Sequence, residues 1–245
     1  MTVEELMPSA PALRGPTLMS QQWQDLGFVH WAVEPERVAG HMPPGVRPDV
    51  LDGRTYVGLV PFRMVDAGVG RGPGVPWLGT FLETNVRLYS VDRTGRRGIV
   101  FLSLDCQRLL VCAGARLSFG VPYRWARMTY DRRGERHAYA SHLLPRDGHA
   151  RVELEAGAAR EPGELEHFLT ARWGLHSRWL GRSWYVPNEH DTWTLREATL
   201  LDLDARVLAS VGLPELVGRA PDHVAFSDGV TTRFGLPRDA RSPRR

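Results

Sequence analysis

The sequence predicts a mainly β protein of the α+β class, an antiparallel barrel or sandwich with a few helices around it. Short runs rich in β-branched and aromatic residues recur along most of the chain. Clusters of Gly, Pro, Asn and Asp separate these runs at the spacing of turns. Helical periodicity occurs in only a few segments, which do not alternate with the strands as βαβ units would.

Local signals predict the elements in chain order. Residues 17–33 carry Trp23, Leu26 and Phe28 as candidates for one apolar face. Pro35 near its start and the Pro43-Pro44 pair at its end predict a short helix between them. Strands are predicted at residues 54–62, 81–91, 98–105, 123–132, 137–143, 150–156, 179–186, 193–200 and 224–234.

The segments between the strands predict turns, one long loop and the remaining helices. A turn at residues 92–95 joins two strands, which are therefore expected to pair antiparallel. The Gly/Pro-rich residues 66–79 are long enough to act as a lid or rim, and residues 188–191 are predicted as a polar turn. Helices are predicted at residues 106–118, 162–172 and 203–211.

One domain is expected at residues 17–236, because 245 residues with 42% hydrophobic content can bury a sizeable core. Residues 1–16 are expected to form a flexible arm and residues 237–245 a flexible basic tail. No apolar run reaches about 18 residues and no signal peptide is recognisable, so the prediction is a cytoplasmic protein that does not bind membranes. The net charge of +3 is spread along the chain, which argues against a nucleic-acid partner.

Several kinds of chemistry are excluded or disfavoured by residue type. The chain contains no Lys, so no side-chain amine can form a Schiff base. Cys106 and Cys112 lack metal or redox spacing and are predicted to be buried thiols. The nine His show no metal-ligand spacing, and no nucleotide-binding loop or nucleophile elbow is present, so neither a metal nor a cofactor is expected.

The predicted strand at residues 81–91 carries candidate polar site residues. Alternation places Glu83, Asn85 and Arg87 on one face, opposite an apolar face. Either this polar face is solvated, or it forms a polar cluster inside a barrel mouth; the pattern supports both interpretations equally. Asp105, at the end of the next strand, is predicted to cap the following helix. His30-Trp31 and the His190/Trp193 pair are further polar-tipped aromatic pairs.

The segment AGARLSFGVPYR, residues 113–124, resembles the signature of acetoacetate decarboxylases, in which AGRE and GFP motifs precede two lysines. The signature Arg, Gly and Pro match Arg116, Gly120 and Pro122. Leu117 replaces the Glu that follows the signature Arg. Tyr123 and Arg124 stand where the resemblance places the catalytic Lys and its partner Lys, and Glu83 matches a pocket Glu in a looser alignment.

A longer stretch resembles the YqjF-like family, a domain of unknown function in the acetoacetate decarboxylase-like superfamily. This resemblance implies a cone-shaped antiparallel β-barrel with a few surrounding helices and a small-molecule pocket. It does not imply a reaction, because fold alone does not determine function. The matching pieces are residues 22–23, 30–31, 57–62, 83–87, 101–105, 122–128 and 168–172.

Within this framework we expect a ligand that is anionic or contains a carbonyl group. Glu83 or Tyr123 would move a proton, Arg116 or Arg124 would bind the anion, and Asn85 and Arg87 would contact the ligand. Lyase, isomerase or cyclase chemistry on keto acids or polyketide-like molecules would fit, without a Schiff base.

Two alternatives remain open, and so does whether the protein is an enzyme. The barrel could bind a small molecule without catalysis, or Arg116 and Glu83 could form a buried ion pair in a closed pocket. Tyr123 and Arg124 pointing into a cavity beside Glu83 would favour a site. The sequence is compatible with a homo-oligomer.

Overall fold

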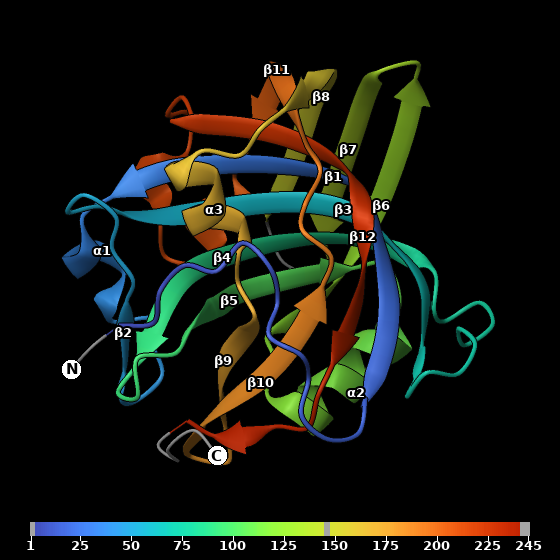
Figure 1. Cartoon of the computed structure of the whole chain (residues 1–245). Helices are drawn as coiled ribbons and strands as arrows, with labels where there is room; N and C mark the ends of the chain where they lie inside the picture. The colour runs from blue at the N-terminus through green and yellow to red at the C-terminus, as the bar shows by residue number, and fades with distance from the viewer. Residues whose placement is uncertain (1–2, 145–147, 241–245) are drawn as a thin grey trace.

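Thirteen strands form one sheet in a computed structural model that describes residues 3–144 and 148–240, apart from the side chains of residues 117–119 (Figure 1). The hydrogen-bonded order is β13-β10-β9-β5-β6-β7-β8-β11-β12-β1-β3-β4-β2. The strands are β1 Met19–Val33, β2 Val46–Pro48, β3 Thr55–Val69, β4 Phe81–Asp92, β5 Arg97–Cys106, β6 Tyr123–Arg133, β7 Arg136–Leu143, β8 His149–Arg160, β9 Gly174–Trp179, β10 Arg182–His190, β11 Leu195–Asp204, β12 His223–Phe234 and β13 Arg238–Asp239.

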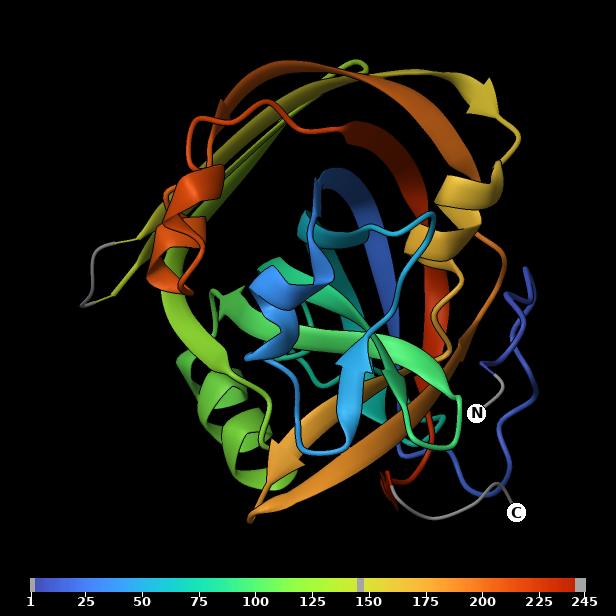
Figure 2. The same ribbon diagram turned by 90° about the vertical axis from the view of Figure 1, so that its left-hand side faces the viewer.

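Two additional pairings fold this sheet back on itself. β4 pairs with β5, and β10 pairs with β12, although these strands are distant in the order above. As a consequence, β8, β11 and β12 curve as an outer wall around β1, β3 and β4 (Figure 2). The helices lie at the periphery: α1 Pro35–Ala39, α2 Leu109–Phe119, α3 Glu164–Thr170, α4 Val207–Ser210 and the 3-10 helix η1 Pro214–Leu216.

The central strands β1, β3 and β4 are buried on both faces. Val86 and Leu88 of β4 point to a core shared with β7, β8, β11, β12, α1 and α4. The opposite face of the same strands meets β5, β9, β10 and α2. Because side chains alternate along a strand, residues one apart in β4 belong to two different interiors.

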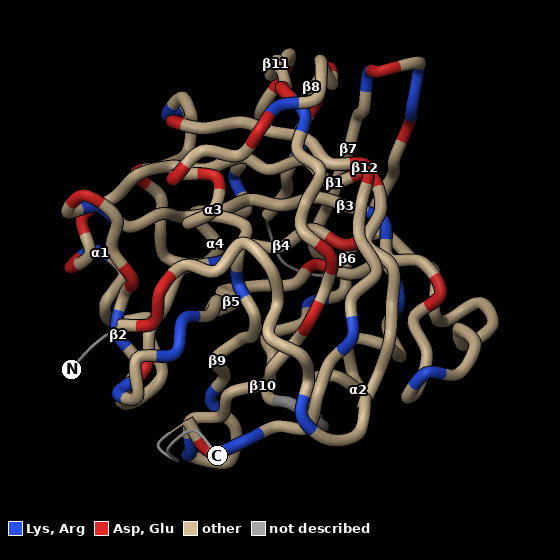
Figure 3. Tube along the Cα trace, viewed as in Figure 1, with Lys and Arg blue, Asp and Glu red and all other residues tan. Residues whose placement is uncertain are grey.

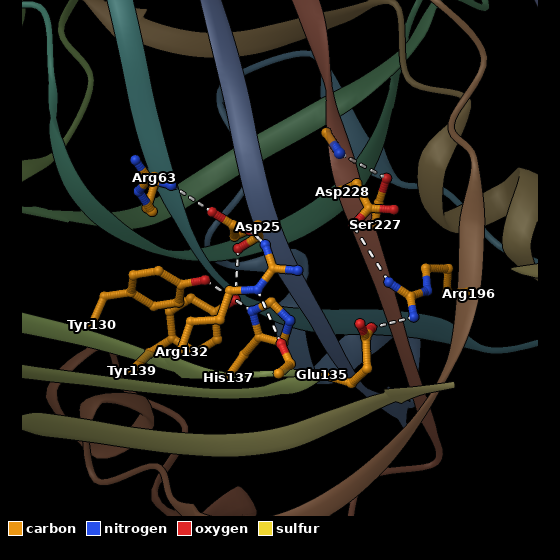
Figure 4. Close-up of polar contacts among 12 residues, drawn as sticks. Asp25, Arg63, Tyr130, Arg132, Glu135, His137, Tyr139, Arg196, Ser227 and Asp228 are labelled. Atoms are coloured by element: carbon orange, nitrogen blue, oxygen red, sulfur yellow. Dashed lines mark hydrogen bonds and ion pairs between the residues drawn. The ribbon is translucent and has the colours of Figure 1, made fainter. Parts of the chain in front are cut away.

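A bulge in β1 keeps one face of that strand directed at the second interior. The pairing of β1 with β3 shifts register between Gln24 and Val29, and Asp25 has a φ of 50°. The bulge therefore lets Trp23 share a face with Leu26. Figure 4 shows the side chains around Asp25, where Arg63 donates to its carboxylate at 2.7 Å and Tyr139 donates to its carbonyl oxygen at 2.6 Å.

Most predicted elements form, and the mainly β class with few helices is confirmed. The predicted antiparallel pairing across the turn at residues 92–95 is also confirmed. The polar turn predicted at residues 188–191 is wrong, because β10 continues through His190 and pairs there with Thr232 of β12. The strand predicted at 179–186 is in fact the end of β9, a tight turn and the start of β10.

The described residues at both ends of the chain contact the sheet. Residues 3–16 contain no helix or strand, but Trp173 Nε1 donates to the Met7 carbonyl at 2.9 Å and attaches this segment to the sheet. Arg238 and Asp239, within the predicted tail, form β13, whereas residues 241–245 lie outside the described residues.

Figure 3 shows acidic and basic residues mixed along the trace. Among the described helices, none has the length and hydropathy needed to span a bilayer.

Candidate functional site

A cavity of about 360 Å³ lies between the central strands and the β9, β10 and α2 side of the molecule. That volume is within the range of sites that enclose small molecules. Its walls are mostly apolar, and their largest side chains include Trp23, Phe62, Met64, Phe81, Trp193 and Phe234. The loop after β3 contributes Val75 and Leu78 to the lining, as the rim role expected for this loop requires.

The polar face of β4 forms part of this cavity. Glu83, Asn85 and Arg87 all line it, and each side chain is buried. This placement decides between the two interpretations of the strand pattern, because a solvated outer face would leave all three exposed.

Glu83 and Tyr123 form a buried hydrogen-bonded pair in the cavity wall. The Tyr123 hydroxyl donates to Glu83 Oε2 at 2.9 Å. Burial raises the pKa of Glu83 to about 8, although the hydrogen bonds from Tyr123 and Asn85 oppose the shift. Burial also raises the pKa of Tyr123 well above its ordinary value, and the Glu83 charge adds to the effect. At neutral pH Glu83 is therefore mostly a carboxylic acid that can give up a proton.

The turn after α2 delivers Tyr123 to this position. Gly120 ends α2 with a left-handed φ of 62°, and a Cβ there would lie 2.7 Å from the Arg178 carbonyl oxygen. The chain then enters β6, which runs parallel to β5 and places Tyr123 beside Leu104. The bend expected from Gly120 and Pro122 thus directs the first β6 side chain into the cavity.

Arg124 is not among the residues that line the cavity, in contrast to the expected inward position beside Tyr123. Consecutive strand residues point to opposite faces, so Tyr123 and Arg124 cannot both face the cavity. Arg124 Nε donates instead to Asp105 Oδ1 at 2.7 Å, and its Nη1 donates to Ser210 at 2.9 Å. Asp105 is fully buried and does not cap α2, whose N-cap is Arg108.

Arg116 is likewise outside the cavity. It lies on an exposed face of α2, while its neighbour Ala115 contributes to the lining. Arg116 is therefore not positioned for the expected ligand contact in this cavity. The alternative of a buried Arg116–Glu83 ion pair is wrong, because Glu83 pairs with Tyr123.

Two other arginines supply positive charge to the cavity. Arg87 donates from Nη2 to the Leu169 carbonyl at 3.0 Å. Arg172 is buried, donates from Nη1 to Asp49 Oδ2 at 2.5 Å and from Nε to the Phe168 carbonyl at 2.7 Å, and also lines the cavity. Arg172 was missed as a site residue although residues 168–172 belong to the family resemblance, because nothing in that piece indicates which way its charge points.

Several buried polar atoms of the lining residues have no hydrogen-bond partner within the described part of the chain. They are Trp23 Nε1, Asn85 Oδ1, Arg172 Nη2 and Asn188 Oδ1. Leaving a buried polar group unpaired costs about 1–3 kcal/mol, so such groups usually mark a place where water or a ligand binds. These atoms are two donors and two acceptors that a ligand or water in the cavity could pair with.

His190 adds a titratable ring to the lining. Its Nδ1 donates to the Asp191 carbonyl at 2.7 Å, and its ring packs 4.5 Å from that of Trp173 between centroids. Burial lowers the pKa of His190 to about 4, so the ring is neutral at pH 7 and Nε2 is left as an acceptor. From the sequence, His190 was identified only as part of a polar-tipped aromatic pair with Trp193 and was not placed in a site.

Within residues 3–144 and 148–240, no cluster of three or more His, Cys, Asp or Glu side chains has the arrangement of a metal site. Cys106 and Cys112 are buried free thiols, as predicted. The polar side chains in the cavity lining include Glu83, Tyr123, Arg87, Arg172, Asn85, Asn188 and His190, among mostly apolar walls.

The fold of this chain resembles that of acetoacetate decarboxylase-like proteins. An acetoacetate decarboxylase-like enzyme from Sphingomonas wittichii RW1 superposes with a TM-score of 0.65 at 14% identity, over 91% of this chain and 92% of that one. The enduracididine biosynthesis enzyme MppR, in complex with pyruvate, gives a TM-score of 0.61 at 14% identity over 94% and 92% of the two chains. At these identities the similarity concerns the fold.

The chain belongs to the DUF2071 family, described as an uncharacterized conserved protein, whose model matches residues 20–231. The uncharacterized protein YqjF of Bacillus subtilis (strain 168) is 29% identical over 186 residues, which cover 74% of this chain and 76% of that protein. The family assignment made from the sequence is confirmed.

Proposed function

We propose that this protein binds an amphipathic carbonyl or carboxylate compound in the cavity and exchanges a proton with it through Glu83. The observation that carries the proposal is the buried Glu83–Tyr123 pair, whose acid is protonated near pH 7 inside an apolar cavity. A perturbed acid in an enclosed pocket is typical of functional sites. We also infer that the closed path of strand pairings is the cone-shaped barrel implied by the resemblance.

The charges of the cavity favour an anionic or carbonyl head group. Arg87 and Arg172 lie in its wall, and Arg172 Nη2 has no partner among the described residues. A charge-assisted hydrogen bond to a carboxylate or enolate would satisfy this donor. The apolar remainder of the wall would accommodate a hydrocarbon body. A solved structure of MppR, a protein of similar fold, is a complex with pyruvate, a small keto acid.

The chemistry would differ from that of an amine-dependent decarboxylase. The chain has no Lys, and Tyr123 occupies the position of the catalytic amine in the resembling signature. Glu83 can protonate a developing enolate, while the Tyr123 hydroxyl and Asn85 stabilise the carboxylate that remains. Lyase, isomerase and cyclase reactions of keto acids can each proceed through such a step.

We expect 2-oxooctanoate to bind in the cavity and to exchange its C3 protons with solvent deuterium near pH 8, where part of Glu83 is ionised: the carboxylate takes a C3 proton, exchanges it with solvent and returns a deuteron to the enolate. Binding is measured by fluorescence, since Trp23 and Trp193 line the cavity, and exchange by proton NMR. Glu83→Gln should bind the probe and lose the exchange. Binding without exchange in the parent would favour the alternative, a non-catalytic binding protein. Absence of binding would overturn the proposal.

Replacing Arg172 with Met is expected to weaken binding of 2-oxooctanoate about 100-fold, because a buried charge-assisted contact contributes roughly 2–3 kcal/mol. Binding of 2-octanone, which has no carboxylate, should change little. Arg97 also donates to Asp49 Oδ2, at 2.5 Å, so the Asp49 carboxylate keeps one cation in the variant. Equal losses for both compounds would show that Arg172 only supports the wall.

A further inference from the structure

A continuous chain of buried polar groups connects the cavity wall with α3. Arg87 donates from Nε and Nη2 to the Tyr89 hydroxyl oxygen at 3.3 and 3.2 Å. The Tyr89 oxygen lies 2.8 Å from His30 Nε2, and His30 Nδ1 lies 3.1 Å from His223 Nδ1. His223 Nε2 lies 3.4 Å from Glu166 Oε1, an ion-pair contact without hydrogen-bond alignment.

The hydrogen bonds assign one position to each proton in this chain. The Tyr89 oxygen accepts two N–H groups from Arg87, so its own O–H donates to His30 Nε2. Neutral His30 then carries its proton on Nδ1 and donates to His223 Nδ1. Neutral His223 accepts this bond at Nδ1 and therefore carries its proton on Nε2, the ring nitrogen that lies 3.4 Å from Glu166 Oε1. Every donor in the chain therefore points away from the cavity.

The surrounding backbone is built to hold this chain. Tyr89 and His30 are completely buried. A Cβ on Gly58 of β3 would lie 3.0 Å from His30 Cδ2 and 3.3 Å from Arg87 Cγ, so glycine leaves room for both side chains.

Among the described residues, Arg160 and Arg172 also face this chain of polar groups. Arg160 of β8 forms an ion pair with Glu166 at 2.8 Å. Arg172, which follows α3, lies 5.0 Å from the centre of the Tyr89 ring. A positively charged side chain therefore lies near each end of the histidine pair, Arg160 on the His223 side and Arg172 on the His30 side.

We propose that Tyr89, His30 and His223 are positioning residues that orient the Arg87 guanidinium toward the ligand, and that they do so only while the histidine pair is neutral. The inference rests on the proposed function, because it assumes that Arg87 contacts the head group of the ligand. It extends that function by making recognition of the anion depend on pH.

The physical reason is that the chain has no place for another proton. A proton added to His30 Nε2 would meet the Tyr89 O–H, and one added to His223 Nδ1 would meet the His30 N–H. Burial lowers the pKa of His30 well below its ordinary value, with further lowering by His223 and Arg87. Burial likewise lowers the pKa of His223, which Glu166 opposes. Protonation at acid pH would break the bond from Tyr89 to His30, so that Tyr89 would turn and release Arg87.

The test measures the ratio of the affinities for 2-oxooctanoate and 2-octanone from pH 8 down to the lowest pH at which the protein stays folded, because the lowered pKa values of both histidines place their protonation at acid pH. Because an ionised Glu83 would repel the anion but not the neutral ketone, every protein in this comparison also carries Glu83→Gln. In the parent the ratio should fall as the pH is lowered. In Tyr89→Phe it should be at least tenfold lower at pH 8 and nearly independent of pH, because Arg87 has lost its acceptor.

Tyr139→Phe is the matched control. It removes the hydrogen bond of another buried tyrosine hydroxyl, to the Asp25 carbonyl, in the cluster of Figure 4 outside the cavity. This variant should keep the parent ratio at every pH. Nitrogen-15 NMR of the parent should show His30 protonated on Nδ1 and His223 on Nε2.

Two results would overturn the inference: a parent-like ratio in Tyr89→Phe, or His30 protonated on Nε2. A parent protein that binds neither compound would overturn the proposed function instead, and the NMR tautomers would still test the order of protons in the chain.

Discussion

Arg124→Met is expected to lower the free energy of unfolding by about 3–5 kcal/mol, the usual cost of removing one partner of a buried ion pair. Asp105 is completely buried, and its carboxylate would lose the guanidinium that lies 2.7 Å away. Burial already raises the pKa of Asp105, while Arg124 opposes this shift. Without Arg124 the carboxyl would take up a proton more readily, so the loss of stability should grow as the pH rises from 5 to 8.

Urea unfolding of the parent and the variant at both pH values measures this loss. The double variant Asp105→Asn/Arg124→Met should recover part of it, since the uncompensated charge is gone. Arg116→Met, on the exposed face of α2, should stay close to the parent. The affinity of Arg124→Met for 2-oxooctanoate should equal that of the parent; a clear loss would return Arg124 to the binding site.

Glu83→Gln is expected to become more stable relative to the parent by about 1.4 kcal/mol for each pH unit between roughly pH 5 and 8. The pKa of Glu83 is raised from 4.5 in the unfolded chain to about 8 in the folded protein. Between these values the folded state binds one proton more than the unfolded state. The stability that Glu83 contributes is thus present below pH 4.5 and lost as the pH rises to 8, whereas Gln has no such dependence.

Thermal unfolding of both proteins across this pH range tests the expectation. The sign alone is diagnostic: an ordinary or lowered pKa of Glu83 would make the difference in stability constant or reverse its slope. Tyr123→Phe is a useful companion, because the lost hydrogen bond should raise the pKa of Glu83 further and extend the slope to higher pH.

Local patterns predicted the parts of the site that depend on one strand or one turn. Alternation in residues 81–91 placed Glu83, Asn85 and Arg87 on a common face, and all three line the cavity. The bend at Gly120 and Pro122 marked the entry of Tyr123. Such predictions succeed because the side-chain period of a strand and the φ of a glycine are local properties.

Predictions that placed residues in the cavity by analogy with a family motif were less successful. Arg116 and Arg124 were expected in the cavity because they flank the same motif, but the helix face of one and the strand alternation of the other direct them away. Arg172 and His190 entered the cavity through the placement of the segment after α3 and of β10, for which the sequence carried no directional signal. Likewise, no spacing in the sequence could have joined His30 to His223, which are 193 positions apart.

The sequence by itself determined the family, the mainly β class, the polar face of β4 and the absence of an amine for Schiff-base chemistry. The tertiary structure decided which charged side chains line the cavity and which form ion pairs within the fold. The physical reason is that an arginine is charged wherever it lies, whereas the group it interacts with depends on which residues the folded chain places beside it. Arg124 found Asp105 on its own face of the sheet, whereas Arg87 and Arg172 were brought to the cavity wall by strands and helices far apart in the chain.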